Sequence, residues 1–242
     1  MIDIGTTDFY FAAPQPSKPD LEKYSLLLFD RWEAGVEKNL ILPDYSLFLE
    51  VEEGSIQGVG KVAASLTALY VGIATYGSFI SGVKTIKEQV VTVSDYLVEK
   101  AEQQLGSDAG PPKVRKYGGT LGSLQRLFVK VQRGEISPEQ ATKEAELLLG
   151  ENAEESPEFM NDLAKSFKTT PRFHQQIGFP FEEYDVFPNV AQIENNQKYD
   201  RPRTSRTPRA PGTPSPPPAS HLRVEVWRES KKHSKNFRTI TI

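Results

Sequence analysis

The Gly-Val-Gly-Lys stretch at residues 58–61 is the first place where residue types in this chain could do chemistry. Glycine amides and a lysine at the start of a helix can hold phosphate oxygens. A Walker A loop also needs glycine where Ser55 stands and serine or threonine where Val62 stands. A dinucleotide-binding loop needs an acidic residue near Ile80, and this stretch of the sequence has none. Because both patterns fail, we predict no nucleotide cofactor.

Other candidates for catalysis or metal binding are equally incomplete. The chain contains no cysteine, and Ser78 and Ser81 lack the Gly-x-Ser-x-Gly pattern of a nucleophile elbow. The histidines lack the spacing of metal ligands; they are His174, His221 and His233. The two acidic clusters follow no calcium-loop pattern; they are Glu50, Glu52 and Glu53, and Glu182, Glu183 and Asp185. We therefore assign no catalytic, metal-binding or cofactor-binding residue.

Charge is distributed unevenly along the 242 residues. Residues 198–242 hold eleven of the 29 Lys and Arg residues but three of the 32 Asp and Glu residues. A basic tail on an acidic body can bind a polyanion, such as nucleic acid or an anionic membrane, or it can dock on its own body. The candidate contacts for a polyanion or a partner are Arg201, Arg203, Arg206, Arg209, Lys231, Lys232 and Lys235.

The N-terminal third reads as strand, helix and strand. Beta-forming residues fill residues 2–13, and Ser17, Pro19 and Asp20 then signal the start of a helix that should end near Asn39. Residues 45–51 alternate apolar and polar side chains, as a half-buried strand requires. The first residues of the chain lack the basic and apolar segments of a signal peptide, which favours a cytoplasmic protein.

Residues 62–83 carry no charge, and their large apolar side chains recur at helical steps. We expect a helix that continues in amphipathic form to Leu105, with Gly77 and Gly82 deciding whether it is one helix or a broken pair. A helix that is apolar nearly all round must be enclosed by protein or by lipid. Its candidate core-facing or membrane-facing residues are Leu66, Leu69, Ile73, Tyr76 and Ile80.

The second half reads as a loop, a helical part, a linker and a hairpin. Glycine and proline predict a loop at residues 106–120, followed by an αα-hairpin whose second helix starts at Ser137-Pro138 and stops at Gly150. Another helix should begin at Pro157 and end before Pro171. Residues 173–190 read as an irregular aromatic segment, and residues 201–218 as an extended proline-rich spacer. Two alternating segments within residues 222–242 predict a β-hairpin that pairs with a sheet edge of the body or of another protein.

These readings predict an α+β, predominantly helical fold. Its expected parts are an α+β part at residues 1–105, a loop at 106–120, a helical part at 121–197, a basic linker at 198–220 and a C-terminal hairpin at 221–242. Three functions remain open. The first is a non-enzymatic interaction, regulatory or scaffold protein with an unidentified protein partner, in which self-association is allowed. The second is a membrane-acting protein that inserts residues 62–83, and the third and weakest is an enzyme that uses carboxylates such as Glu50 or Glu52.

Overall fold

The computed structural model describes residues 1–13, 16–53, 55–106, 110–173 and 221–242. Residues 1–173 and 220–242 form one compact unit, and everything that follows concerns its described part. The expected aromatic segment beyond Phe173, the proline-rich spacer and the four arginines at positions 201, 203, 206 and 209 lie outside the described residues.

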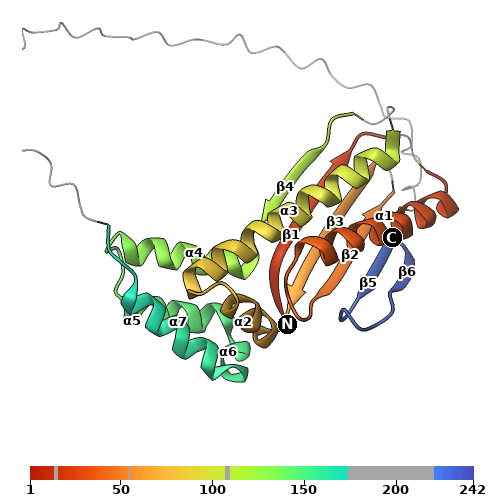
Figure 1. Cartoon of the computed structure of the whole chain (residues 1–242). Coiled ribbons are helices and arrows are strands. Elements are labelled where there is room, and N and C mark those ends of the chain that lie inside the picture. Colours follow the sequence, from red (N-terminus) through yellow and green to blue (C-terminus); the bar gives the residue numbers. More distant parts are fainter. Residues whose placement is uncertain (14–15, 54, 107–109, 174–220) are drawn as a thin grey trace, which may run out of the picture. The chain divides into compact units, whose positions relative to one another are not determined.

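A single six-stranded sheet forms the centre of this unit (Figure 1). The strand order is β4-β1-β3-β2-β5-β6, and every neighbouring pair is antiparallel. The strands are β1 (Ile2–Phe11), β2 (Ser46–Glu52), β3 (Ile56–Ala64), β4 (Lys113–Tyr117), β5 (Leu222–Arg228) and β6 (Asn236–Thr241). Together with the helices they confirm a mixed α+β fold.

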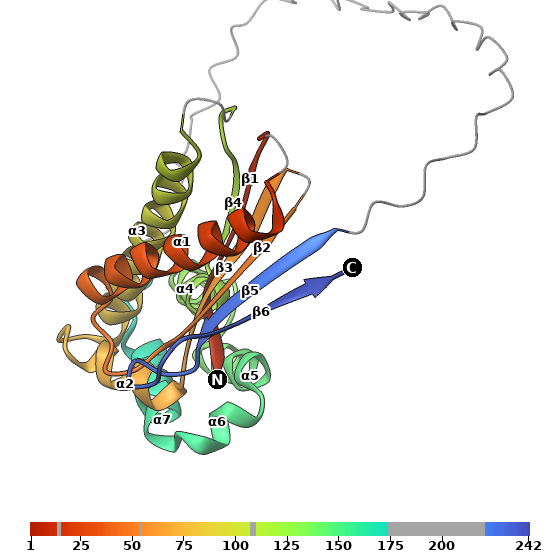
Figure 2. The ribbon, with the colours of Figure 1, turned by 90° about the vertical axis from the view of Figure 1, so that its right-hand side faces the viewer.

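The helices lie in two groups. Helices α1 and α3 run across one face of the sheet, while α2 and α4 to α7 gather at one end of it (Figures 1 and 2). The helices are α1 (Lys18–Asn39), α2 (Leu66–Ala74), α3 (Phe79–Leu105), α4 (Gly119–Gln132), α5 (Pro138–Leu149), α6 (Glu151–Glu155) and α7 (Pro157–Thr169). The predicted N-terminal strand, the helix ending at Asn39 and the strand near residues 45–51 are all confirmed.

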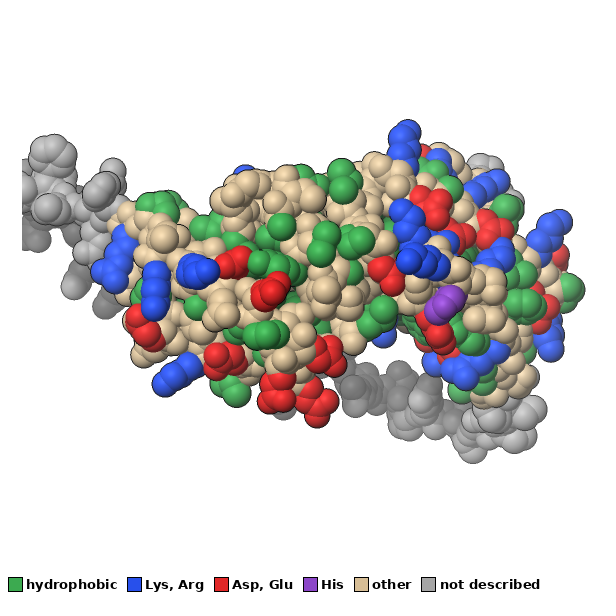
Figure 3. Space-filling view, turned by 60° about the horizontal axis from the view of Figure 1, so that its bottom comes forward, with side chains coloured by type: hydrophobic (Ala, Val, Ile, Leu, Met, Phe, Trp, Pro, Cys, Tyr) green, Lys and Arg blue, Asp and Glu red, His purple; other side chains and the backbone are tan. Residues whose placement is uncertain are grey.

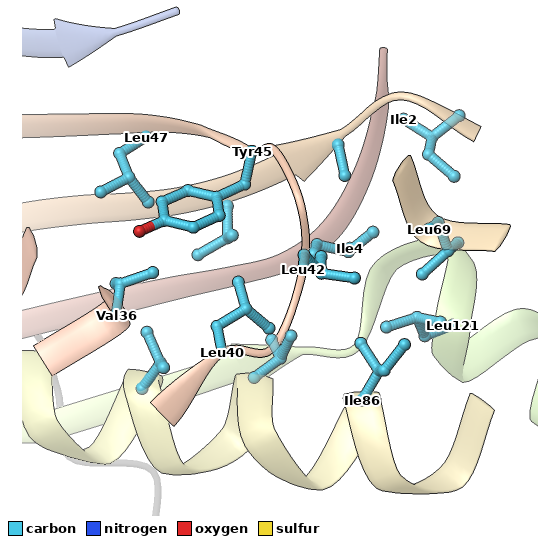
Figure 4. Close-up of a cluster of buried hydrophobic side chains, with 14 of the residues drawn as sticks. Ile2, Ile4, Val36, Leu40, Leu42, Tyr45, Leu47, Leu69, Ile86 and Leu121 are labelled. Atoms are coloured by element: carbon cyan, nitrogen blue, oxygen red, sulfur yellow. The ribbon is translucent and has the colours of Figure 1, made fainter. Parts of the chain in front are cut away.

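The main core lies between the sheet and helices α1 and α3. Leu47 and Leu49 on β2 and Ile4 on β1 point into it, and Figure 4 shows Leu40, Leu42 and Ile86 meeting them from the helical side. All six side chains are at most 4% exposed. Each such side chain, once removed from water, contributes about 1.5–3 kcal/mol to folding. This burial fixes which face of each strand is turned inward.

Strand β3 corrects the expectation that a helix begins at Val62. Residues 56–64 alternate between buried and accessible, and Val62 and Ala64 are buried strand residues. The signal was hidden because two inward positions are glycines. A Cβ at Gly58 would lie 2.2 Å from the ring of Phe9, and one at Gly60 would lie 2.3 Å from Leu97. The glycines that suggested a phosphate loop therefore make room for core side chains.

The apolar stretch after β3 folds as a broken pair of helices. Helix α2 starts at Ser65, whose hydroxyl accepts a hydrogen bond from the amide of Ala68, and Gly77 turns the chain with a φ of 75°. Helices α2 and α3 then meet at a bend of 110°. No single described helix passes a length-and-hydropathy test for a membrane span, although this bent pair passes it together. Leu66, Leu69 and Ile73 are at most 1% exposed, while Tyr76 and Ile80 are half-buried against the same core.

The stretch expected to be a loop, residues 106–120, contains edge strand β4. It pairs with β1 from Thr6 opposite Tyr117 to Tyr10 opposite Lys113. Its five residues are mostly exposed, which explains why they show no clear apolar alternation. The helices that follow it pack into the same compact unit as the sheet.

A chain of aromatic rings holds the helical end together. The ring centroid of Phe79 on α3 lies 5.1 Å from that of Phe159 on α7 and 6.3 Å from that of Phe128 on α4. The ring centroids of Phe128 and Phe167 are 4.5 Å apart.

The predicted αα-hairpin is confirmed as α4 and α5. Ser137 and Gln140 form the expected capping box, and Gly150 ends α5 with a φ of 54°.

The C-terminal hairpin adds β5 and β6 to the body's own sheet. Strand β5 pairs with β2 from Leu47 opposite Arg228 to Glu52 opposite Arg223. The predicted hairpin is thus confirmed, and of the two docking sites considered it uses the edge of its own body. Because a two-stranded hairpin alone is marginal in water, this pairing explains why it is ordered.

The bend between α2 and α3 depends on Gly82. A Cβ there would lie 2.5 Å from the backbone oxygen of Ile73, whereas a Cβ at Gly122 in α4 would meet nothing closer than 3.8 Å. Gly82→Ala should therefore lower the free energy of unfolding by about 1–3 kcal/mol through overpacking. Gly122→Ala, the matched control, should raise it by about 1 kcal/mol because alanine favours helix. Urea denaturation measures both, and a stabilised Gly82→Ala protein would contradict this account of the bend.

Candidate functional site: the open face of the sheet

No described helix covers the face of the sheet turned away from α1 and α3 (Figure 2). On β3, Gln57 and Lys61 are exposed while their neighbours Gly58 and Gly60 are buried, so the strand separates a closed face from an open one. We call this second surface the open face. By strand register it comprises Lys113, Arg115, Tyr117, Thr6, Asp8, Tyr10, Gln57, Val59, Lys61, Phe48, Glu50, Glu52, Arg223, Glu225, Trp227, Asn236, Arg238 and Ile240.

Two aromatic side chains lie opposite each other on this face. Phe48 on β2 is the register partner of Trp227 on β5. Both are half-buried, and each carries a cation over its ring: Lys61 at 5.8 Å from Phe48 and Arg238 at 5.7 Å from Trp227. A hollow of about 440 Å³ lies beside them, and its lining includes Met1, Ser46 and Glu229. The lining of this hollow is mainly apolar.

A network of charges borders the aromatic pair. Glu50 and Glu225 face each other across β2 and β5, a pairing of like charges that is unfavourable by itself. Two arginines offset it. Arg238 donates from Nε to Glu225 Oε2 at 2.6 Å, and Arg223 lies 3.4 Å from Glu50 while donating to Glu52 at 2.8 Å.

Burial and the neighbouring charges shift the pKa of Glu50. Burial raises the pKa of Glu50 above its usual value, the nearby Arg223 guanidinium lowers it, and the carboxylates of Glu52 and Glu225 raise it again. The net direction is upward. Among the described residues, no metal-binding cluster lies beside Glu50. The carboxylates of this network are largely balanced by the two arginines.

The other end of the open face repeats the combination of rings and cations. Lys113 lies 5.5 Å over the ring of Tyr10, and Arg115 is the register partner of Asp8. Tyr117 is 50% exposed. Side chains of both charges thus occur across the sheet, and aromatic side chains occur at both ends.

Behind the open face, a buried arginine fastens β5 to α1. The Arg228 side chain is 8% exposed, forms an ion pair with Glu33, and lies 3.5 Å from Glu37. Its guanidinium also lies 5.7 Å over the ring of Tyr45, whose pKa burial raises to about 12. Burial raises the pKa of Glu33 as well, with Arg228 opposing that shift. These contacts hold β5 in the position that brings Trp227 to the opposite face.

The three predicted lysine contacts of the tail lie in the turn between β5 and β6. Asp44 Oδ1 accepts hydrogen bonds from the Lys231 amide at 2.8 Å and the Ser230 hydroxyl at 2.9 Å. Burial opposes ionisation of Asp44, but these hydrogen bonds outweigh it and lower its pKa. Lys235 pairs with Asp30 on α1, and Lys232 is exposed. The turn is therefore tied to the body, and its role in polyanion binding stays a prediction.

Acidic side chains gather elsewhere on the body, over α6 in the lower part of Figure 3. Glu151, Glu154 and Glu155 on α6 and Glu158 on α7 are all exposed. Among the described residues, no group of three or more histidine, aspartate or glutamate side chains could hold a metal ion. His221 and His233 are exposed, and His174 lies outside the described residues.

Comparisons with known proteins do not identify this chain. It matches no protein-family model, no curated protein and no solved structure.

Sequence reasoning missed the aromatic pair of the open face. The alternation of residues 45–51 puts Phe48 on the outward side of β2, but nothing in the sequence links it to Trp227. The available signal was the alternation on each strand, which puts both side chains on the polar side of an amphipathic strand. Their pairing requires the register between β2 and β5, whose partners lie about 180 residues apart in the chain.

Arg223→Gln tests the charge network, because Arg223 is the cation that lowers the pKa of Glu50 most, ahead of Lys61. Its loss should raise that pKa further above the unfolded value, so the folded form binds this proton more tightly than the unfolded chain does. The stability lost on substitution should then be greatest near pH 7 and shrink toward about pH 4, where the carboxylates become protonated.

Urea denaturation at both pH values, with NMR titration of the glutamate carboxyls, measures the effect of Arg223→Gln. Arg126→Gln on α4 serves as the control, because Arg126 bonds to Ser123 and lies outside the network. An equal loss of stability at both pH values would mean that Arg223 acts through packing alone.

Proposed function

We propose that this chain is a non-enzymatic protein-interaction module that binds a polypeptide partner through the open face of its sheet. The observation that carries the proposal is the facing pair Phe48 and Trp227 beside an apolar hollow of about 440 Å³. Aromatic residues and arginine are the residue types that contribute most to protein interfaces.

The chemistry of the hollow suggests what the partner presents. Phe48, Trp227 and Met1 offer apolar surface, while Arg238 and Glu229 stand in its lining as opposite charges. A partner segment with a large apolar or aromatic side chain, flanked by polar residues, would fill the hollow and pair with those charges. Central burial of such an anchor contributes most of the affinity in many protein complexes.

The charge balance argues against a polyanion as the ligand of this face. Glu50, Glu52 and Glu225 occupy its centre, and the arginines beside them already bind carboxylates. Phosphate binding requires cations whose charge is not already balanced. A polyanion partner is therefore better sought at the basic tail than on the open face.

The alternatives of bilayer insertion and carboxylate catalysis receive less support. Leu66, Leu69 and Ile73 contribute to the protein core, so insertion would require them to leave it. Glu50 and Glu52 share Arg223, so their charges are already engaged in an ion-pair network. Turnover in a broad panel of hydrolase and transferase assays would overturn the non-enzymatic proposal.

A displayed peptide library selected on the full chain tests the binding proposal. Peptides selected by the natural sequence should carry a large apolar or aromatic residue. They should bind Trp227→Ala at least about 30-fold more weakly, the loss expected for an aromatic anchor. Binding can be measured by fluorescence anisotropy with a labelled peptide.

Leu147→Ala is the matched control for that selection, since Leu147 is an apolar side chain that is 84% exposed on α5. It should leave peptide affinity unchanged. Equal affinity for the natural chain and Trp227→Ala would contradict the proposal. Tight binding of a labelled single-stranded oligonucleotide that depends on Trp227 would instead assign the face to nucleic acid.

A further inference from the structure

At the β6 edge of the sheet, the backbone amides and carbonyls of alternate residues point away from β5. Ile242 and His221 exchange two hydrogen bonds, at 2.8 Å and 3.2 Å, so Ile242 turns its amide and carbonyl toward β5. The register of β6 on β5 is regular, and the direction of these groups alternates along an antiparallel strand. Phe237, Thr239 and Thr241 therefore turn their amides and carbonyls to the open edge.

The two edges of the sheet differ in how they are protected. Edge strand β4 places Lys113, Arg115 and Lys116 within five residues, and such charges discourage a further strand from pairing. Edge strand β6 has one charge, Arg238, which is already paired with Glu225. The other five residues of β6 are uncharged and include two threonines and one isoleucine, and Phe237 is 52% exposed. Among the described residues, no strand pairs with this edge.

We propose that β6 pairs antiparallel with β6 of a second copy of this chain, about a twofold axis through Thr239. In this register Thr239 lies opposite Thr239, and Phe237 lies opposite Thr241 on both sides of the axis. Each of these pairs brings together the outward amides and carbonyls and can exchange two hydrogen bonds. The interface is the same patch on both subunits, so it closes as a dimer.

Charge selects this register over its neighbours. With the axis at Thr239, each Arg238 lies opposite Ile240, and Thr opposite Thr is a favourable cross-strand pair. An axis at Arg238 would place the two arginines opposite each other, and an axis at Ile240 would shorten the overlap. The equivalent pairing of two β4 strands about Arg115 would oppose like charges.

The dimer has a consequence for the open face that goes beyond the binding proposal. A twofold axis perpendicular to the sheet keeps the same face of both copies on the same side. The two sheets therefore form one continuous sheet, and the two hollows beside Trp227 lie on a shared surface. A partner with two anchors could then bind both copies, with a gain in avidity.

A single cysteine at the axis tests the register directly, because the natural chain contains none. Directly opposite residues in a hydrogen-bonded antiparallel pair lie about 5.5 Å apart at Cα, within the range of a disulfide. Under mild oxidation, the full chain with Thr239→Cys should convert mostly to a disulfide-linked dimer. Leu147→Cys, at a more exposed site on α5, should remain mostly monomeric.

A second pair of variants tests the edge hydrogen bonds without a new covalent bond. Thr239→Pro removes one outward amide and leaves the pairing with β5 intact, as proline allows on an edge strand. Thr239→Val keeps that amide, and both variants lose the hydrogen bond from Thr239 to Glu22. Sedimentation equilibrium should show self-association weakened by about 30-fold in Thr239→Pro relative to Thr239→Val.

Three results would overturn the dimer. They are a monomeric natural chain at the highest soluble concentration, equal self-association of Thr239→Pro and Thr239→Val, and growth into open-ended assemblies in which Thr239→Cys does not crosslink. None of these results bears on peptide binding at Trp227, so the two proposals can fail separately.

Discussion

The pairing of β5 with β2 is the contact on which the other features of the sheet depend. It joins residues 222–228 to residues 46–52 and completes a six-stranded sheet. Without this pairing, Trp227 would not lie opposite Phe48, and β6 would not form an edge of the sheet. The ladder is held on both sides: Arg228 binds Glu33 behind the sheet, and Arg223 binds Glu50 and Glu52 in front. The buried pair on the helical side specifies position, because an arginine removed from water requires its carboxylate.

The two faces of the sheet follow different physical rules. The closed face is packed so tightly that Gly58 and Gly60 have no room for a side chain. The open face tolerates Glu50 and Glu225 opposite each other because Arg223 and Arg238 form ion pairs with these two carboxylates. This difference leaves aromatic side chains such as Trp227 available where the protein does not need them for its own core.

The two proposals place function in the hairpin that arrives last in the chain. Its β5 supplies half of the aromatic pair beside the hollow, and its β6 supplies the unprotected edge. The sequence divides into an acidic body and a basic tail, and two basic residues of the tail, Arg228 and Lys235, form ion pairs with acidic side chains of α1. Part of the basic charge of residues 198–242 is therefore paired with the chain's own body.

The sequence by itself determined the elements whose signals are local: helix α1, the capped hairpin of α4 and α5, helix α7 and both C-terminal strands. Caps, prolines and periodic apolar residues act within a few positions, so they can be read without a partner. Only the tertiary structure decided that Val62 belongs to a strand, that the apolar stretch bends at Gly77, and that β4 exists. Those outcomes depend on which distant side chains fill the space beside a glycine and which strand lies alongside. The candidate site was hidden for the same reason, because Phe48 and Trp227 become neighbours only through a register set between residues far apart in the chain.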